Sequence, residues 1–363
     1  MVLCSVLFQT LLCWGQSSSS NPSSQPGLHY KEVTGNEIQG RTTHAGAAFH
    51  RIDTAQFADI PANVKQLYTH SAGLYVTFST NSTQIRAKWC TSPAKTYNNL
   101  AAIAFEGMDL YIKREGKWVY AGVGRPGSQD CTESTLVAEM DTEQKECLLY
   151  LPLYDSTDKL EIGVDSTADF EFSASPFNHR IPVYGTSIVH GASASRPGLA
   201  YPARLSRMSG LDFINLGISG SAKMEPQVAD MIAEMQMDAL IIDCVPNCSP
   251  DNITERTAGF IQKIRSEHPD IPIIAIEGAF FESGNFNRKI AEDMHLRNER
   301  FREEIAKLQK SDPHLFLIGA EGLMGDDHEG TIDGTHPNDL GFDRMIQKIL
   351  PATKNILKGY NLL

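Results

Sequence analysis

The hydrophobic pattern of this chain changes its period once, near residues 173–179, and this change restricts the fold more than any other feature. Before it, from about residue 28 to residue 172, short segments alternate apolar and polar side chains, as at residues 74–79 and 84–89. Gly, Asn and Asp residues separate these segments. A period of two with frequent turn residues predicts an all-β, jelly-roll-like sandwich of antiparallel strands with few long helices.

After the change, solidly apolar segments alternate with amphipathic ones. The predicted strands are residues 181–184, 213–216, 239–245, 271–276 and 315–318. The predicted helices are residues 201–208, 227–235, 254–267, 287–310 and 340 to about 357, and we expect Pro351 to kink the last helix or to break it in two. Apolar strands separated by helices predict a buried parallel sheet inside a three-layer α/β/α domain.

The predicted organisation is therefore a leader at residues 1–27, a β-sandwich domain at residues 28–175 and an α/β domain at residues 180–363. Residues 2–14 are apolar, but a bilayer span needs about 20 residues. A Ser-, Asn- and Pro-rich run follows at residues 17–26, which indicates an export signal and a flexible tether. We expect a periplasmic or secreted protein without an integral membrane span, and Cys13 would allow a lipid anchor.

The charge of the chain narrows the choice of partners. The formal net charge is −12, and no Lys- or Arg-rich run occurs. An acidic surface repels phosphate backbones and anionic lipid headgroups, so nucleic acid and membrane surfaces are poor candidates. A neutral small molecule or glycan fits this charge better. The pattern makes no prediction about the oligomeric state.

The cysteines do not indicate a disulfide framework. Five of the seven lie outside the leader, and they are Cys90, Cys131, Cys147, Cys244 and Cys248. An odd number argues against disulfides as the organising principle, although one pair in the N-terminal half remains an option. Cys244 and Cys248 have no further His or Cys at zinc-ligand spacing, so we interpret both as small buried hydrophobic residues. We expect neither a metal nor a cofactor.

Polar residues follow the predicted strands of the α/β half at the point where each strand ends. Ser187 follows the first strand in Gly185-Thr186-Ser187, Gly217 ends the second, and Asn247 follows the third. Near the C-terminus lies the segment Asp333-Gly334-Thr335-His336. In open α/β sheets, ligands bind outside the carboxyl ends of the strands, so we expect these residues to meet at one edge of the sheet.

The residue types suit nucleophilic catalysis. A serine hydroxyl such as that of Ser187 is inert near neutral pH unless a base takes its proton. An imidazole can accept and return a proton in this range, which makes His336 the expected base. Asp333 lies three residues earlier and can accept from the other ring nitrogen, which fixes the tautomer, while Gly334 permits the tight turn.

Attack by serine on a carbonyl creates an oxyanion that needs hydrogen-bond donors. The backbone N–H groups of Ser187 and Gly217 and the side-chain amide of Asn247 are the predicted donors. Gly217 would let the backbone approach the reacting group closely.

At these residues the chain resembles the SGNH (GDSL-like) hydrolases. Gly-x-Ser, the Gly of Asn-Leu-Gly, the Asn of Asp-Cys-Val-Pro-Asn, and Asp-Gly-Thr-His-Pro-Asn are similar to the four blocks of that family. Thr186 departs from the pattern, because GDSL enzymes carry Asp there. The segments at 184–188 and 194–198 resemble a two-domain bacterial branch with an N-terminal β-sandwich, often linked to deacetylation of carbohydrates.

The resemblance implies a serine esterase that hydrolyses small acyl esters, above all acetyl esters on carbohydrates. It implies a triad of Ser187, His336 and Asp333, an acyl-enzyme intermediate, and an oxyanion hole of Ser187, Gly217 and Asn247. Two alternatives stay open: a lipase or thioesterase for longer acyl chains, and a glycan-binding protein with an idle esterase half. The absence of Gly-x-Ser-x-Gly argues against the α/β-hydrolase elbow.

Several other residues have competing interpretations. We interpret His190 as a partly exposed histidine at a helix start rather than a second base. Arg196 either holds a substrate oxygen or pairs with a local acid, and Glu277 either orients a nearby loop or is a surface or capping carboxylate.

For two further groups of residues, a structural interpretation is favoured over a functional one. The consecutive residues 326–329 (Asp-Asp-His-Glu) resemble metal ligands, but consecutive side chains diverge in extended chain, so a solvated loop is favoured. For Tyr111, Trp118 and Tyr120, positions in the core or on a sheet face are favoured over a sugar-stacking surface.

Overall fold

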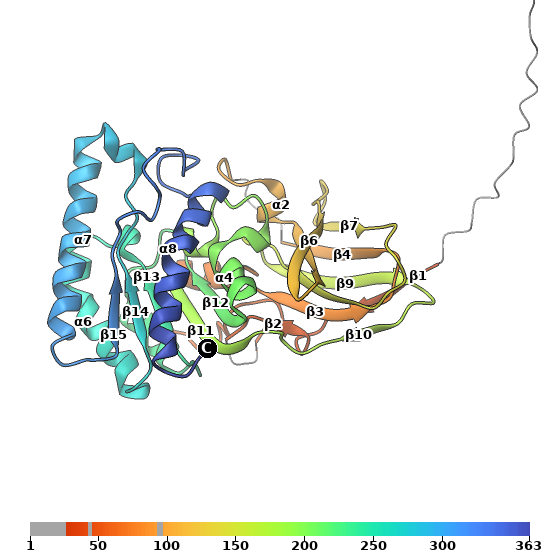
Figure 1. Ribbon diagram of the computed structural model, residues 1–363, viewed down its shortest axis with the longest axis horizontal. Coiled ribbons are helices and arrows are strands. Elements are labelled where there is room, and N and C mark those ends of the chain that lie inside the picture. The colour runs from red at the N-terminus through yellow and green to blue at the C-terminus, as the bar shows by residue number, and fades with distance from the viewer. Residues whose placement is uncertain (1–26, 43–45, 93–96) are drawn as a thin grey trace, which may run out of the picture.

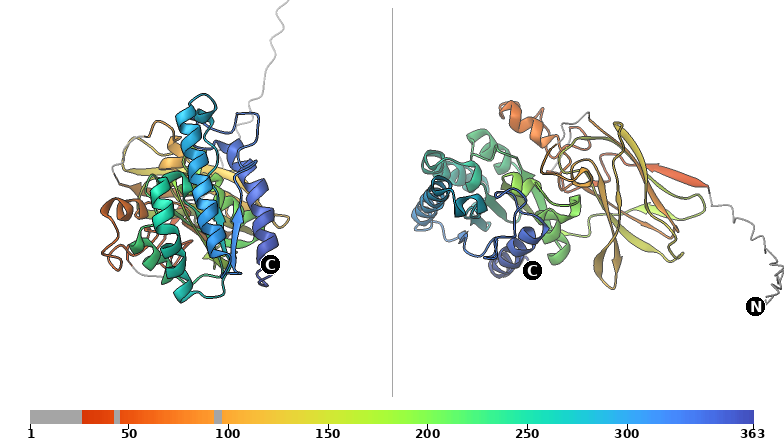
Figure 2. Two further views of the ribbon diagram at one scale, coloured as in Figure 1. Left: turned by 90° about the vertical axis from the view of Figure 1, so that its left-hand side faces the viewer. Right: turned by 90° about the horizontal axis from the view of Figure 1, so that it is seen from above.

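The computed structural model describes residues 27–42, 46–92 and 97–363. The predicted export signal and tether, apart from Gly27, lie outside the described residues. The described chain forms an antiparallel β-rich half and an α/β half that lie side by side along the long axis of the molecule (Figures 1 and 2). Within the described ranges, none of the helices combines the length and the apolar character needed to cross a bilayer.

The N-terminal half contains two antiparallel sheets. One has the strand order β1-β9-β4-β7, and the other has the order β10-β3-β8-β5-β6, with β2 paired to β3. The strands are β1 (Leu28–Glu32), β2 (Ile38–Gln39), β3 (Tyr75–Thr80), β4 (Ile85–Thr91), β5 (Met108–Arg114), β6 (Lys117–Gly124), β7 (Cys131–Val137), β8 (Lys145–Tyr150), β9 (Thr157–Asp165) and β10 (Phe170–Phe172). Two short helices, α1 (Ala62–Tyr68) and α2 (Ala102–Phe105), interrupt the strands. The predicted β-sandwich with few helices is confirmed.

Alternating side chains explain how these sheets pack. In β4 the residues Ile85, Ala87 and Trp89 are buried, while Arg86 and Lys88 between them are only partly buried. The buried residues meet apolar side chains of the second sheet in one hydrophobic core. Successive strand residues point to opposite faces, so the period of two in the sequence directly places one face inside.

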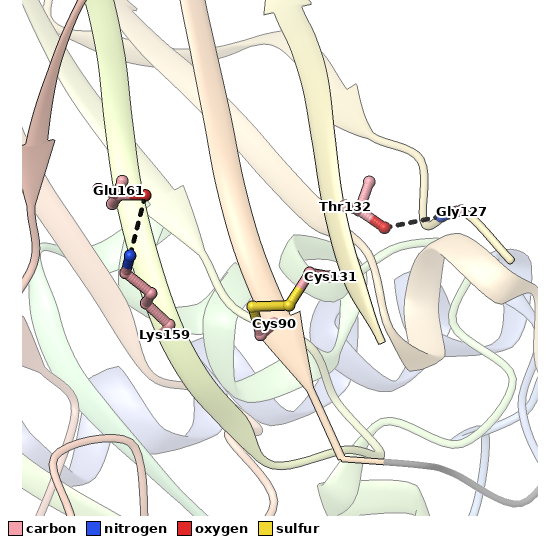
Figure 3. Close-up of a disulfide and its surroundings, with 6 residues drawn as sticks. All are labelled: Cys90, Gly127, Cys131, Thr132, Lys159 and Glu161. Carbon is pink, nitrogen blue, oxygen red and sulfur yellow. Dashed lines mark hydrogen bonds and ion pairs between the residues drawn. A yellow bond between two sulfur atoms is a disulfide. The ribbon is translucent and has the colours of Figure 1, made fainter. Parts of the chain in front are cut away.

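A disulfide joins two neighbouring strands of this half (Figure 3). Cys90 on β4 lies opposite Cys131 on β7, so the bond closes the end of that strand pair. This confirms that one pair forms in the N-terminal half. Cys147, Cys244 and Cys248 are free and buried, which confirms the interpretation of the last two as small hydrophobic residues.

The C-terminal half contains a five-stranded parallel sheet with the order β12-β11-β13-β14-β15. Its strands are β11 (Asn178–Gly185), β12 (Leu211–Gly217), β13 (Leu240–Asp243), β14 (Ile273–Ile276) and β15 (Leu315–Ile318). All five coincide with predicted strands to within a few residues. The strand order reverses at β11, the first strand of this half, because β12 lies on one side of it and β13 on the other.

Helices cover both faces of this sheet, which completes the predicted three layers (Figure 1). The short α3 (Ser187–His190), α4 (Tyr201–Ser209) and α8 (Asp339–Lys358) contribute to the core on one face. On the other face pack α5 (Pro226–Ala233), α6 (Pro250–Glu267) and α7 (Arg288–Leu308). Three short 3₁₀ turns complete the half: η1 (Pro197–Leu199), η2 (Val245–Asn247) and η3 (Glu282–Asn285).

Pro351 does not break the last helix in two, because α8 runs through it without interruption. Proline removes the hydrogen bond to the carbonyl four residues earlier, which here belongs to Gln347. Pro351 and Gln347 are both exposed, so water can reach that carbonyl. The apolar face of α8, which includes Phe342 and Ile349, continues across the proline and keeps the helix on the sheet.

The two halves share their hydrophobic cores. Four apolar residues that come before β3 in the chain pack with α5 and α6 on one face of the parallel sheet. They are Ile52, Ile60, Val64 and Tyr68. On the other face, the core includes Ala104 and Phe105 of α2 and Leu153 and Tyr154 from the segment after β8. The β-rich half is therefore built into the α/β half rather than only linked to it.

Candidate active site

Ser187 is the first residue of α3, directly beyond the carboxyl end of β11. Thr186 caps this helix, since its hydroxyl accepts a hydrogen bond from the Ile188 N–H at 3.2 Å. Gly185 allows the sharp turn, because a Cβ there would lie 2.3 Å from the Asp243 carbonyl oxygen and from Val189 Cγ2. Thr186, where GDSL enzymes carry Asp, thus has a structural role at the helix start.

The structure brings Ser187, His336 and Asp333 together in one chain of hydrogen bonds. Ser187 Oγ lies 2.9 Å from His336 Nε2, and His336 Nδ1 lies 2.8 Å from Asp333 Oδ2. With Nε2 as the acceptor for the serine hydroxyl, Nδ1 carries the proton and donates it to the carboxylate. This is the arrangement in which imidazole can take the serine proton during attack.

Asp333 folds back on its own turn. Its Oδ1 accepts hydrogen bonds from the N–H groups of His336 at 2.8 Å and Thr335 at 3.0 Å. Gly334 adopts a φ of +83°, the left-handed conformation that this turn requires. Partial burial raises the pKa of Asp333, but hydrogen bonds from the backbone and imidazole of His336 and from Asn99 outweigh it and lower the pKa to about 2. The Asp333 carboxylate is therefore ionised near neutral pH.

A cavity of about 490 Å³ opens beside Ser187 Oγ and His336. Gly220 and Asn247 line it together with Ser187. The Asn247 carbonyl oxygen Oδ1 accepts from the Ala222 N–H at 3.3 Å, which turns the NH₂ end of the amide away from that contact. Asn247 and Ser187 thus lie where the sequence predicted them, on one cavity.

The predicted oxyanion role of Gly217 is wrong. Its N–H donates to Asn215 Oδ1 at 2.9 Å, and its carbonyl accepts from the buried guanidinium of Arg51 at 2.7 Å. The described residues that line the cavity include Gly220 but not Gly217. The glycine at position 217 is required by packing, because a Cβ would lie 2.1 Å from the His190 backbone nitrogen. The second glycine of Gly217-Ile218-Ser219-Gly220, three residues past the strand end, lines the cavity instead.

Residues of the N-terminal half also line the cavity, and sequence analysis missed them. They are Tyr97, Asn99, Leu100 and Tyr154. The Tyr154 hydroxyl lies 2.7 Å from Ser219 Oγ, next to Gly220, and burial raises the pKa of Tyr154 well above its usual range. No motif marks these residues, because they come from loops whose position depends on how the two halves meet.

His190 is buried, not partly exposed as predicted. Its Nε2 lies 2.7 Å from the Leu153 carbonyl oxygen, and its ring stacks on Tyr154 with centroids 4.1 Å apart. Burial lowers the pKa of His190 well below its usual value. The neutral ring packs against Tyr154, which lines the cavity, and has no hydrogen bond to Ser187 Oγ among the described contacts.

The structure settles the two interpretations left open. Arg196 pairs with an acid, since Nη1 lies 2.6 Å from Oδ2 of the buried Asp109 on β5. Glu277 is buried and orients a loop, because it accepts from Arg302 Nε at 2.7 Å and from the Ala320 N–H at 2.9 Å. Ala320 lies just beyond β15, so this carboxylate holds the segment that follows the strand.

The acidic run at 326–329 is a loop whose side chains turn to different partners. Asp327 Oδ1 accepts from Arg344 Nη1 at 2.6 Å, while His328 Nδ1 lies 2.9 Å from Glu282 Oε2. Among residues 27–42, 46–92 and 97–363, no group of three or more His, Cys, Asp or Glu is arranged to hold a metal ion.

The three aromatic residues of β5 and β6 lie where the structural interpretation placed them. Tyr111 belongs to a small buried cluster, and the guanidinium of Arg207 lies 3.9 Å from its ring centre. Tyr120 is half exposed on the sheet face, and the guanidinium of Arg196 lies 4.4 Å from its ring centre.

Each half of the chain matches a known protein-family model. Residues 178–354 match the model of the GDSL-like lipase/acylhydrolase family, and residues 28–170 match a model described as the N-terminus of the SGNH-hydrolase-type esterases. The latter is named GxDLY, and Gly107-Met108-Asp109-Leu110-Tyr111 of β5 carries these letters. No curated protein matches the chain.

Three solved structures cover almost the whole described chain. A Bacteroides ovatus protein assigned as a GDSL-like lipase is 52% identical, with a TM-score of 0.89 over 92% of this chain and 98% of its own. The salicylyl-acyltransferase SsfX3 of a tetracycline biosynthetic pathway is 17% identical, with a TM-score of 0.73 over the same shares. A family two carbohydrate esterase from Cellvibrio japonicus is 11% identical, with a TM-score of 0.60, again over 92% and 98%.

The last two similarities concern the fold alone. The first is close enough, over nearly the whole of both chains, to establish kinship. Together with the family match to the α/β half, it shows that this chain belongs to the GDSL-like lipase/acylhydrolase family and is a carboxylic ester hydrolase.

Proposed function

We propose that the chain hydrolyses small acyl esters, chiefly acetyl esters on carbohydrates, with Ser187 as nucleophile, His336 as base and Asp333 as the group that orients it. The observation that carries this proposal is the hydrogen-bonded series Ser187 Oγ, His336 Nε2 and Nδ1, Asp333 Oδ2, with distances of 2.9 and 2.8 Å, at the edge of a cavity. Attack by Oγ on the ester carbonyl transfers the serine proton to Nε2. Collapse of the tetrahedral intermediate returns that proton to the departing alcohol and leaves an acyl-serine, which water hydrolyses by the same route.

In this proposal the oxyanion accepts hydrogen bonds from the Ser187 N–H, the Gly220 N–H and the Asn247 amide. Gly220 replaces the predicted Gly217, whose N–H is already bonded to Asn215. Gly220 has a φ of +68°, and no atom outside its chain neighbours lies within 4 Å of the position that a Cβ would take. The removal of one such donor typically costs about 3 kcal/mol of transition-state stabilisation.

The lining of the cavity favours a neutral substrate. None of its described residues is Lys, Arg, Asp or Glu. Tyr97, Tyr154 and Phe281 contribute aromatic rings, which suit the apolar faces of a sugar. Lipases, thioesterases and idle glycan-binding proteins are the competing assignments.

The first experiment compares hydrolysis of p-nitrophenyl acetate by the wild type and by Ser187→Ala. We expect kcat to fall by roughly 10⁴-fold or more in the variant, because it loses the hydroxyl that contacts His336 Nε2. Ser266→Ala, on the exposed side of α6, is the matched control and should retain full activity. Equal turnover by the wild type and Ser187→Ala would refute the assignment of the nucleophile.

A series of acetyl, butyryl and octanoyl esters then separates the competing functions. A steep fall in kcat/KM from acetyl to octanoyl, together with release of acetate from acetylated oligosaccharides, is the expected result. A rise with chain length would indicate a lipase. No turnover of any ester, combined with binding of glycans, would indicate a binding protein.

We further propose that the protein is exported to the periplasm or beyond. The Cys90–Cys131 disulfide supports this, because such bonds persist mainly in oxidising compartments. Fractionation of cells that express the full chain, with the disulfide probed by alkylation, tests the proposal.

A further inference from the structure

Asn99 lies in a loop of the N-terminal half, between strands β4 and β5, yet its side chain reaches the turn that carries Asp333 and His336. Its Nδ2 lies 3.1 Å from Asp333 Oδ2 and 3.4 Å from His336 Nδ1. The donor end of the amide must face these atoms, because a carbonyl oxygen there would oppose the carboxylate.

The short distance to His336 Nδ1 is not a second hydrogen bond. Nδ1 carries a proton when Nε2 accepts from Ser187, and it donates this proton to Asp333 Oδ2 at 2.8 Å. The Asn99 N–H and the imidazole N–H therefore converge on a single oxygen. Such an arrangement leaves the carboxylate little freedom to rotate away from the ring.

Asp333 receives four hydrogen bonds in the described structure. Two come to Oδ1 from the backbone of Thr335 and His336, and two come to Oδ2 from His336 and Asn99. Three of these donors belong to the same turn as Asp333. Asn99 is the donor that fixes the carboxylate relative to the rest of the protein.

The position of Asn99 is itself held by contacts on both sides. Its backbone carbonyl accepts from Ser193 Oγ at 3.0 Å, and Ser193 belongs to the loop that follows α3 and Ser187. The next residue, Leu100, packs against the core of the α/β half, and α2 begins two residues later within that core. Asn99 thus contacts the loop after the nucleophile and the turn that carries the base.

We propose that Asn99 is a positioning residue of this active site: its amide holds the Asp333 carboxylate in line with the His336 imidazole and makes the N-terminal half necessary for catalysis. The inference rests on the proposed triad. It assigns the β-rich half a part in the reaction besides any contact with the substrate.

The test uses Asn99→Leu and Asn99→Asp in the full chain, with Asn98→Asp as the matched control. Asn98 is the exposed neighbouring residue, so this control adds the same charge one residue away. Asn99→Leu removes the donor at similar volume, and kcat for p-nitrophenyl acetate should fall roughly tenfold, with KM within about twofold. Thermal unfolding of each variant checks that the fold is retained.

Asn99→Asp separates positioning from simple packing. A second carboxylate beside the imidazole favours its protonated form, so the acidic limb of the kcat/KM profile should move upward by about one pH unit. The other groups that act on this turn are Asp333 and His336 themselves. Asn98→Asp should leave the limb in place.

A second measurement does not depend on turnover. In the Ser187→Ala background, NMR of ¹³C-labelled histidine, with His336 assigned by His336→Gln, should show His336 titrating at higher pH in Asn99→Asp than in Asn98→Asp. An unchanged kcat in Asn99→Leu, or equal shifts in the two Asp variants, would overturn the inference. If the wild type hydrolyses no ester, the proposed function fails, and this titration alone decides the role of Asn99.

Discussion

Two carboxylates of the α/β half have opposite surroundings. Asp333 receives four hydrogen bonds, and they lower its pKa to about 2 in spite of partial burial. Asp243, at the end of β13, is fully buried with the Tyr201 hydroxyl at 2.7 Å, and this burial raises its pKa to about 6. Burial raises the pKa of both acids, and the hydrogen bonds to Asp333 outweigh this effect, whereas the single Tyr201 hydroxyl at Asp243 does not.

This difference gives a prediction for Asp243→Asn, which keeps an acceptor for Tyr201 but cannot ionise. The unfolded Asp has a pKa near 3.9, so unfolding of the wild type releases a proton between about pH 4 and 6, and stability falls as the pH rises through this range. At pH 7.5 the variant should therefore be more stable by roughly 2 to 3 kcal/mol. Urea unfolding at pH 7.5 and 4 measures this. An advantage that persists undiminished at pH 4 would contradict the explanation.

At the scale of elements, α8 shows that packing can maintain a helix that contains a proline. Pro351 sits on the exposed side, and the buried side of the helix includes Phe342, Ile346 and Ile349. The lost backbone hydrogen bond is thus on the side that water can reach, whereas the apolar contacts lie on the other.

Replacement of this proline should stabilise the protein. Pro351→Ala restores an N–H donor to the Gln347 carbonyl and removes a helix breaker, and the greater entropy of the unfolded chain offsets part of the gain. We expect an increase of about 1 to 2 kcal/mol in the free energy of unfolding. Pro250→Ala is the control, because Pro250 is the first residue of α6, where proline is well tolerated. A destabilised Pro351→Ala would contradict this explanation.

At the scale of the whole molecule, Arg51 connects the N-terminal half to the site. It is fully buried, and its guanidinium donates to the carbonyl oxygens of Leu67 and His70 on one side and of Gly217 on the other. Asn215 links Gly217 to α3, because its Oδ1 accepts from the Gly217 N–H and its Nδ2 donates to the Val189 carbonyl. One side chain of the β-rich half thus supports both α3 and the end of β12.

Arg51→Met should lower the free energy of unfolding by about 3 to 5 kcal/mol, because several buried carbonyl groups lose their donor. Arg300→Met is the matched control. Arg300 is half exposed on α7 and pairs with Glu303 at 3.0 Å, and its loss should cost less than about 1 kcal/mol. Chemical unfolding of the two variants tests this, and similar losses in both would mean that the buried contacts of Arg51 contribute little.

Much of the architecture was predictable from local pattern. The period of two placed Ile85, Ala87 and Trp89 on one face of β4, and the apolar runs located all five parallel strands, because burial acts on each segment through its own periodicity. Ser187, Asn247, Asp333 and His336 could be proposed from the sequence because they follow strand ends or share one tight turn, and such positions depend on neighbours in the sequence.

The remaining features depend on contacts between segments that are distant in the sequence. Whether an N–H is free for an oxyanion depends on which side chain already binds it, and Asn215 takes the donor of Gly217. Whether a histidine near the nucleophile is exposed depends on what covers it, and Tyr154 covers His190. Asn99 reaches Asp333 across 234 positions of sequence. Local pattern was enough to predict the elements and to propose the reacting groups. Their surroundings depend on long-range packing, because hydrogen bonding and burial are shared between segments that no local pattern relates.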